Sequence, residues 1–208
     1  MGSGLIWSAF AGLLILGLGA PATGQTIAAK AGLTSSNITE SPTIPGDELQ
    51  RNTAAMAGVA FTSPARGRLA LQIEGLFSQK GNRLVNDQAG IDSRLTIDYL
   101  EIPVLVRFDV ASAPSTSLRV HTGPAFGFKL RRKETGFGVP LPEDDQIKIT
   151  GADVGIAFGA EIEHKRLTAG ARYTLGLSNI FDDDPVLYGV DKLTNRVFSV
   201  YGGWLLKK

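Results

Sequence analysis

The stretch 118–129 reads Leu-Arg-Val-His-Thr-Gly-Pro-Ala-Phe-Gly-Phe-Lys, in which apolar residues alternate with glycine, alanine and single charges. Alternation with a period of two indicates a β-strand with two different faces. Small residues weaken a strand whose polar face meets open solvent. They suit a cramped polar interior instead, and the apolar face of the strand must then look outward. An apolar exterior around a polar interior describes a β-barrel in lipid.

Eight segments carry strand-like patterns, which fit one domain in a chain of 208 residues. They are 27–34, 54–62, 68–79, 95–110, 118–130, 147–162, 167–177 and 196–206. The segment 95–110 is out of phase, because its upper apolar residues Leu95, Ile97 and Tyr99 occupy the odd positions that Glu101 and Arg107 occupy lower down. This change predicts a β-bulge near Tyr99–Leu100, or a strand end that rises above the bilayer.

The connections between these segments alternate in length. Those at 63–67, 111–117 and 163–166 have tight-turn compositions, whereas those at 35–53, 80–94, 131–146 and 178–195 are long. All the long loops therefore fall at one end, as in outer-membrane barrels with short periplasmic turns and long external loops. The sequence predicts an all-β fold, an eight-stranded antiparallel up-and-down transmembrane β-barrel with both termini on the periplasmic side.

A continuous apolar run covers residues 5–18, and the small residues Gly19, Ala20, Ala22 and Gly24 follow it. This pattern predicts a signal peptide over 1–24, cleaved after Ala20, Ala22 or Gly24, and an outer-membrane barrel domain over 25–208. No Lys or Arg precedes the run, so an uncleaved anchor is the alternative, although the run is shorter than the roughly 20 residues of a spanning helix. The chain has no cysteine and a net charge of +1, which gives no reason to expect thiol chemistry or nucleic-acid binding.

Charged residues on the small-residue faces are expected to lie in the lumen. Four are acidic and four are basic: Glu74, Glu101, Asp153 and Glu161 against Arg107, Arg119, Lys129 and Arg172. Because an unpaired buried charge is costly, this balance predicts a plug of ion pairs rather than an open pore. Hydration near the rims is the alternative for any one of them. We expect His121 to join this network as a hydrogen-bonding residue.

Aromatic residues should gather at the two membrane interfaces. The residues predicted to form this aromatic girdle are Phe77, Tyr99, Phe108, Phe128, Tyr173, Phe198 and Trp204. The alternative is that these side chains pack a soluble core.

Five short motifs occur in order along the chain: Lys-Ala-Gly-Leu at 30–33, Glu-Gly-Leu-Phe-Ser-Gln-Lys-Gly at 74–81, Tyr-Leu-Glu-Ile-Pro-Val-Leu-Val-Arg-Phe at 99–108, Gly-Pro-Ala-Phe-Gly at 123–127 and Arg-Tyr-Thr-Leu-Gly-Leu-Ser-Asn-Ile at 172–180. Together they resemble the PorT-type outer-membrane β-barrel proteins of Gram-negative bacteria, over about 27–206. The resemblance implies an eight-stranded membrane barrel without an established catalytic role. Some relatives are implicated in protein secretion or gliding machinery. Such barrels usually finish on an aromatic residue that the assembly machinery reads, whereas here Trp204 lies four residues before the end.

Few residues suggest chemistry. The acidic clusters Asp182-Asp183-Asp184 and 143–145 are candidates for binding a divalent cation, which would bridge to lipopolysaccharide; solvated loops are the alternative. The basic run 131–133 is a candidate for direct contact with lipid phosphates. His164 falls in a turn. There is no phosphate-binding loop, no GxSxG motif and no zinc-binding pair, so we expect no catalytic residues, no metal and no cofactor.

The sequence therefore predicts a small integral protein of the bacterial outer membrane with a structural or interaction role and no enzymatic activity. The expected partners are outer-membrane lipid and lipopolysaccharide, the outer-membrane assembly machinery and an unidentified protein bound through the external loops; nucleic acid is not expected. Three alternatives stay open. They are a narrow channel or secretion and assembly accessory factor, an outer-membrane enzyme of the barrel type, and a soluble lipocalin-like barrel with an apolar interior.

Overall fold

The computed structural model describes residues 24–41, 48–86, 91–136, 139–140, 150–180, 182 and 192–207. The strands are β1 Thr26–Ser41, β2 Glu48–Thr62, β3 Leu69–Asn86, β4 Ile91–Ala113, β5 Thr116–Gly136, β6 Val139–Pro140, β7 Ala152–His164, β8 Leu167–Gly176 and β9 Lys192–Lys207. Within these ranges, no helix is both long enough and apolar enough to cross a membrane.

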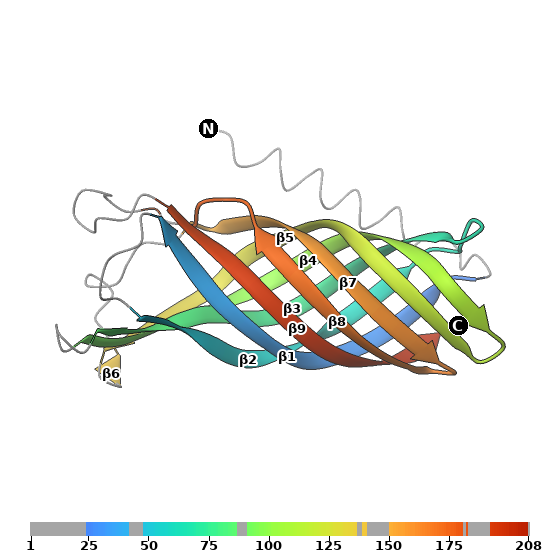
Figure 1. The fold of residues 1–208 in the computed structure, drawn as a ribbon, viewed down its shortest axis with the longest axis horizontal. Helices are drawn as coiled ribbons and strands as arrows, with labels where there is room; N and C mark the ends of the chain where they lie inside the picture. The colour runs from blue at the N-terminus through green and yellow to red at the C-terminus, as the bar shows by residue number, and fades with distance from the viewer. Residues whose placement is uncertain are drawn as a thin grey trace.

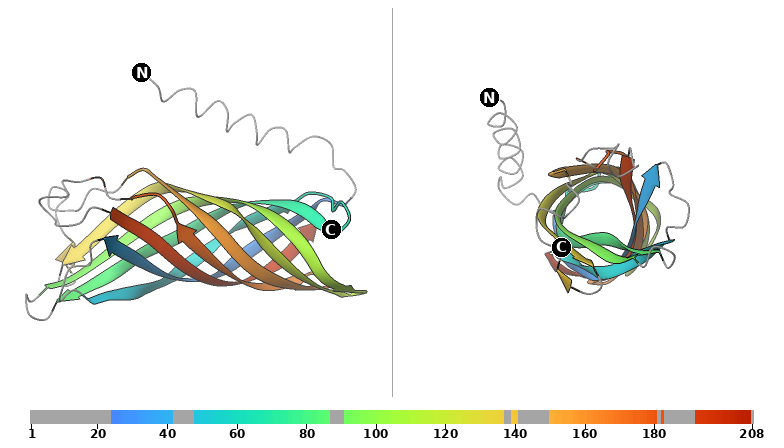
Figure 2. Two further views of the ribbon diagram at one scale, coloured as in Figure 1. Left: turned by 45° about the horizontal axis from the view of Figure 1, so that its top comes forward. Right: turned by 90° about the vertical axis from the view of Figure 1, so that its left-hand side faces the viewer.

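The eight long strands pair in a closed ring, and Figures 1 and 2 show the resulting barrel. Each pairs antiparallel with its neighbours along the chain, and β9 closes the ring against β1 through a long ladder that includes Leu33↔Val200 and Ser41↔Lys192. The short β6 pairs only with the end of β5, at Thr135 and Gly136. Closure leaves none of the eight long strands with a free edge, which matters because lipid offers no partner for an unpaired backbone group. The predicted eight-stranded antiparallel barrel is confirmed.

The two ends of the barrel differ. The short turns 63–68, 114–115 and 165–166 lie at one end, which is also where β1 begins and β9 finishes (Figure 1). At the other end the strands run farther than predicted: β1 continues to Ser41, β3 to Asn86 and β5 to Gly136. Much of the predicted long loops is therefore strand, because backbone hydrogen bonding continues after the apolar face has ended. The predicted start of the sixth strand at Ile147 lies outside the described residues, and β7 begins at Ala152.

Apolar side chains cover the outside of the barrel and polar ones fill the inside. Val154 and Phe158 on β7 are 39% and 48% exposed, whereas Asp153 beside them is 5% exposed. On β8, Tyr173 is 37% exposed and its neighbour Arg172 is 4% exposed. The apolar exterior and polar interior are those of a lipid-embedded barrel, whereas a lipocalin-like barrel has an apolar interior.

The expected bulge in β4 is wrong, whereas the alternative, a strand end that continues beyond the apolar outer surface, agrees with β4 extending past the outward-facing Leu100 and Asp98 to Ile91. Leu95, Ile97 and Tyr99 face the lumen together with Leu105 and Arg107, so one face of β4 looks inward along its whole length. A register shift does occur at this level, but the extra residue is Leu130 on β5, since Tyr99 pairs with Lys129 and Asp98 pairs with Arg131. The apolar residues of upper β4 face inward and pack there against Ile38, Ile180 and Leu193 from other parts of the chain.

Glycines on the inner face make room for large side chains from other strands. A Cβ atom on Gly159 would clash with Nε2 of His121 and would lie 2.6 Å from the carbonyl oxygen of Ala171. A Cβ atom on Gly170 would lie 2.7 Å from the ring of Tyr201. The small residues that define the sequence pattern are therefore the space into which the buried polar side chains fit.

Candidate functional site

The centre of the lumen is an ion-pair network built around Glu74 on β3. Arg172 on β8 donates two hydrogen bonds to the two oxygens of Glu74, at 2.7 and 2.8 Å. Lys30 on β1 lies 3.0 Å from the same carboxylate. The Glu74 carboxylate has no exposed surface, so its charge is compensated entirely by protein groups. Two-point contact between guanidinium and carboxylate is the strong form of such a pair.

Lys30 links this centre to the far wall of the lumen. Its Nζ atom lies 2.7 Å from Oε2 of Glu161 on β7 and 4.5 Å from the centre of the Tyr201 ring on β9. Sequence reasoning missed Lys30, because the first strand was short and poor in large side chains. The signal that could have revealed Lys30 is that its neighbours on the same strand face, Ala28 and Gly32, are small. Small residues on one face mark the lumen side of β5 in the same way.

Arg107 joins the network through the neutral side chains of Thr62 and Gln72, and His121 joins it beside Arg172. Arg107 on β4 donates to Oγ1 of Thr62 at 3.0 Å and to Oε1 of Gln72 at 2.9 Å, and Gln72 in turn donates to Glu74 at 2.5 Å. His121 is buried and lies 3.5 Å from Nε of Arg172. Gln72 therefore connects the cation on β4 to the central carboxylate.

A second ion-pair group lies nearer the end with the long loops. Lys80 on β3 bridges Glu101 on β4 at 2.5 Å and Asp153 on β7 at 3.3 Å. Asp153 also accepts hydrogen bonds from Asn195 at 2.7 Å and Ser178 at 3.0 Å. Lys80 was missed because it fell at the start of a predicted loop, and the prolonged β3 brings it inside.

A third group lies toward the short turns. Arg119 on β5 pairs with Asp109 on β4 at 3.0 Å and with Glu163 on β7. Both acids were missed: Asp109 lies at the end of a predicted strand and Glu163 in a predicted turn. Lys129, also expected in the lumen, is half-buried beside the β5 bulge.

An apolar layer spans the lumen near the long-loop end. It consists of Ile38 on β1, Leu95, Ile97 and Tyr99 on β4, Ile180 after β8 and Leu193 on β9. Each of these side chains is at most 7% exposed. The Tyr99 ring lies against the charged layer below, with Nζ of Lys80 4.7 Å from its centre. The prediction that Tyr99 belongs to the aromatic girdle is therefore wrong.

The other aromatic residues predicted for the girdle lie on the outside. Phe77, Phe108, Tyr173, Phe198 and Trp204 are exposed, and Phe128 is half-buried on the outward face of β5. Phe158 was missed. It pairs with Tyr173, which pairs with Phe198, so an aromatic row crosses β7, β8 and β9. Cross-strand aromatic pairs of this kind stabilise sheets.

The candidate cation-binding cluster stays a prediction. Asp182 is exposed, and Asp183, Asp184 and 143–145 lie outside the described residues. Among the described side chains, no three potential ligands come together as a metal site. His164 is exposed in the β7–β8 hairpin, where Nδ1 lies 2.9 Å from Oγ1 of Thr116. Likewise, the predicted signal peptide over 1–24 falls almost wholly outside the described residues.

Residues 25–182 match the family described as the outer membrane protein beta-barrel domain. The chain belongs to this family, which places it in the bacterial outer membrane. A search of curated proteins gives no match.

Solved structures share the fold at low identity. The outer membrane protein OprG from Pseudomonas aeruginosa is 13% identical, with a TM-score of 0.54, and the match covers 89% of this chain and 97% of OprG. Ail, the attachment invasion locus protein of Yersinia pestis, is 15% identical with a TM-score of 0.47, covering 88% of this chain and 99% of Ail. OprG therefore supports the barrel architecture, and at this identity it supports nothing finer.

Proposed function

We propose that this protein is a non-conducting, non-enzymatic barrel that serves as a structural scaffold for its long-loop end, where the protein meets its partners. The single observation that carries the proposal is that two kinds of layer fill the lumen at successive levels. The first consists of ion pairs, and the second, nearer the long-loop end, consists of apolar side chains. A barrel filled in this way is a rigid support rather than a path for solutes.

The ion-paired layers cross the lumen from wall to wall. The contacts around Glu74 and Lys30 connect β1, β3, β7 and β8, and the contacts around Lys80 connect β3, β4 and β7. A passing ion would have to displace these pairs. Such displacement leaves a buried charge without compensation, which is costly.

The apolar layer adds a second barrier of a different kind. Ile38, Ile97 and Leu193 reach it from three different strands and are almost completely buried. A constriction lined by apolar side chains excludes water and hence hydrated ions. The two barriers act in series, so loss of one alone leaves the other in place.

The described residues also support the absence of catalysis. His121 is enclosed among Arg172 and its neighbours in the lumen, and His164 is in a hairpin at the short-turn end. Neither can meet an extracellular substrate at the long-loop end. A barrel-type enzyme needs nucleophile and base together near that rim.

Within the family, we assign the chain to the PorT type on the five motifs at 30–33, 74–81, 99–108, 123–127 and 172–180. Two of their charged residues, Glu74 and Arg172, form the central ion pair. A role as a secretion or assembly accessory factor is the second candidate, and it uses the same closed barrel with a protein bound at the loops connecting the long strands.

The test is conductance in planar lipid bilayers of the full chain, folded as judged by heat-modifiable gel mobility. The wild-type protein should give no single-channel steps. Lys30→Ala, Glu74→Ala and Arg172→Ala together should still give none, because the apolar layer remains. Removing the second ion-pair group as well, with Lys80→Ala, Glu101→Ala and Asp153→Ala, and adding Ile97→Ala and Leu193→Ala should open the barrel. Adding the outward-facing Val200→Ala and Leu206→Ala to the first triple variant, as a control, should not. Steps in the wild-type protein would refute the proposal and favour a narrow channel.

A further inference from the structure

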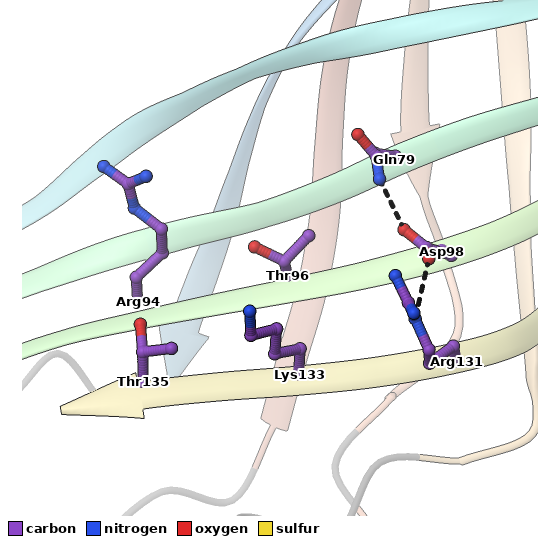
Figure 3. A pocket seen from close by; sticks show the side chains of 7 residues that line it. All are labelled: Gln79, Arg94, Thr96, Asp98, Arg131, Lys133 and Thr135. Atoms are coloured by element: carbon purple, nitrogen blue, oxygen red, sulfur yellow. Dashed lines mark hydrogen bonds and ion pairs between the residues drawn. The ribbon is translucent and has the colours of Figure 1, made fainter. Parts of the chain in front are cut away.

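A basic hollow lies on the outer face of the barrel, across β3, β4 and β5 (Figure 3). It has a volume of about 300 Å³ and is lined by Gln79, Arg94, Thr96, Asp98, Arg131, Lys133 and Thr135. It is separate from the lumen network, and nothing in the proposed function depends on it. Its lining holds three cations, Arg94, Arg131 and Lys133, and one acid, Asp98.

The strand pairing places these cations side by side on one surface. Across β4 and β5, Arg94 pairs with Thr135, Thr96 with Lys133 and Asp98 with Arg131. Arg94, Arg131 and Lys133 therefore share one surface, and an anion bound among these three cations would reduce their mutual repulsion.

One residue of the hollow is held in place by the protein itself. Asp98 is 7% exposed, accepts a hydrogen bond from Gln79 at 2.8 Å and pairs with Nε of Arg131 at 3.2 Å. The Arg131 side chain stays 73% exposed, so its remaining donors are available to a ligand. Asp98 therefore orients one guanidinium and leaves the hollow with two further cations.

The position of the hollow relative to the apolar surface identifies the ligand class. On three adjacent strands, the outward residues change from apolar to polar at the same point: Phe77 to Gln79 on β3, Leu100 to Asp98 on β4 and Leu130 to Arg131 on β5. The apolar stretch on β3 runs from Leu69 to Phe77, which matches the roughly 9–11 residues of a spanning strand. The hollow thus lies just beyond the hydrocarbon edge, at the end opposite the short turns.

We propose that this hollow binds the phosphate groups of lipid A, the membrane-embedded part of lipopolysaccharide, on the outer leaflet. The three cations meet the phosphates, and the exposed side chains of Phe77, Leu100 and Leu130 directly below meet the acyl chains. A soluble polyanion would use the cations alone. The continuity between a basic hollow and an apolar shelf is what favours an anionic lipid.

The test is titration of the folded full chain in detergent micelles with lipid A, followed by isothermal calorimetry. The variant Arg94→Gln, Arg131→Gln, Lys133→Gln should weaken binding by roughly 100-fold, since each of the three basic side chains near an anionic surface contributes about 1 kcal/mol. The matched control Arg66→Gln, Arg68→Gln, Arg166→Gln makes the same charge change at the opposite rim and should bind as the wild-type protein does. A milder variant, Arg94→Gln with Lys133→Gln, retains the Arg131–Asp98 pair if the triple variant does not fold.

Two further probes decide the source of the anion. Lipid A from which the phosphates have been removed should bind the wild-type protein as weakly as lipid A binds the triple variant. A soluble sulfated polysaccharide should bind more weakly than lipid A. Equal binding of both lipid forms, equal loss in the control variant, unchanged binding in the triple variant or tighter binding of the polysaccharide would each overturn the proposal.

Discussion

The two layers of the lumen nearest the long-loop end differ in polarity. Around Lys80, Glu101 and Asp153 the interior is ionic, whereas immediately beyond, at Ile97 and Leu193, it is apolar. Both layers lie on inward-facing positions of the same strands. The difference teaches that the direction of a side chain and its polarity are separate properties. Alternation along the strand decides which side chains point into the lumen. Whether those side chains are charged or apolar changes with their level along the barrel.

The largest expected effect comes from breaking the central ion pair. Glu74→Gln leaves the buried guanidinium of Arg172 without its carboxylate, which should lower the free energy of unfolding by about 3–5 kcal/mol. Urea-induced unfolding in lipid vesicles measures this change. The exposed Asp182→Asn serves as the control and should change stability by less than about 0.5 kcal/mol.

The same pair offers a sharper form of this prediction. Adding Arg172→Met to Glu74→Gln removes the uncompensated charge and should recover part of the lost stability. If Glu74→Gln alone costs less than about 1 kcal/mol, the central layer is hydrated rather than ion-paired, and the contrast with the apolar layer disappears.

The apolar layer should respond through packing rather than charge. Ile97 is fully buried, so Ile97→Ala should cost about 2–4 kcal/mol through lost contacts and a cavity. Urea titration again provides the measurement, and Val200→Ala, which faces the lipid, is the control. A cost equal to that of the control would mean that Ile97 does not pack inside the lumen.

A smaller effect should come from filling inner space. Gly159→Ala brings a methyl group against His121 and the backbone of Ala171, which should cost about 1–3 kcal/mol. Gly202→Ala, on the outer face, would place its Cβ atom 3.7 Å from the nearest oxygen and should be almost neutral. The folded fraction that remains after heating to a series of temperatures, read from heat-modifiable gel mobility, gives the melting temperature of each variant. Equal melting temperatures would contradict the crowded interior.

The smallest effect should come from the outer aromatic row. Tyr173→Leu keeps an apolar side chain toward lipid but loses the cross-strand contacts with Phe158 and Phe198, at a cost of about 0.2–1 kcal/mol. Urea titration with Leu175→Val as the reference measures this difference. A loss as large as that of Glu74→Gln would show that the exterior, rather than the lumen, dominates stability.

Much of the barrel could be predicted from local pattern. Asp153 beside Val154 and Arg172 beside Tyr173 assign inside and outside correctly, because neighbouring side chains of a strand must point to opposite faces. Two of the lumen residues that were missed, Lys80 and Glu163, lie where strands were predicted too short, whereas Lys30 lies inside a predicted strand whose inner face was not recognised. The strands of Lys80 and Glu163 continue because the ladder hydrogen bonds persist beyond the apolar face, and side-chain pattern carries no record of that.

The sequence by itself determined the class of fold, the number of long strands and the facing of most residues, since a period of two is a local property of the chain. Only the tertiary structure decided which charges meet, that Tyr99 packs with its apolar neighbours inside the lumen, and that Arg94, Arg131 and Lys133 share one hollow. The physical reason is that ring closure and the bulge at Leu130 set the register between strands, and register brings together residues far apart in the chain.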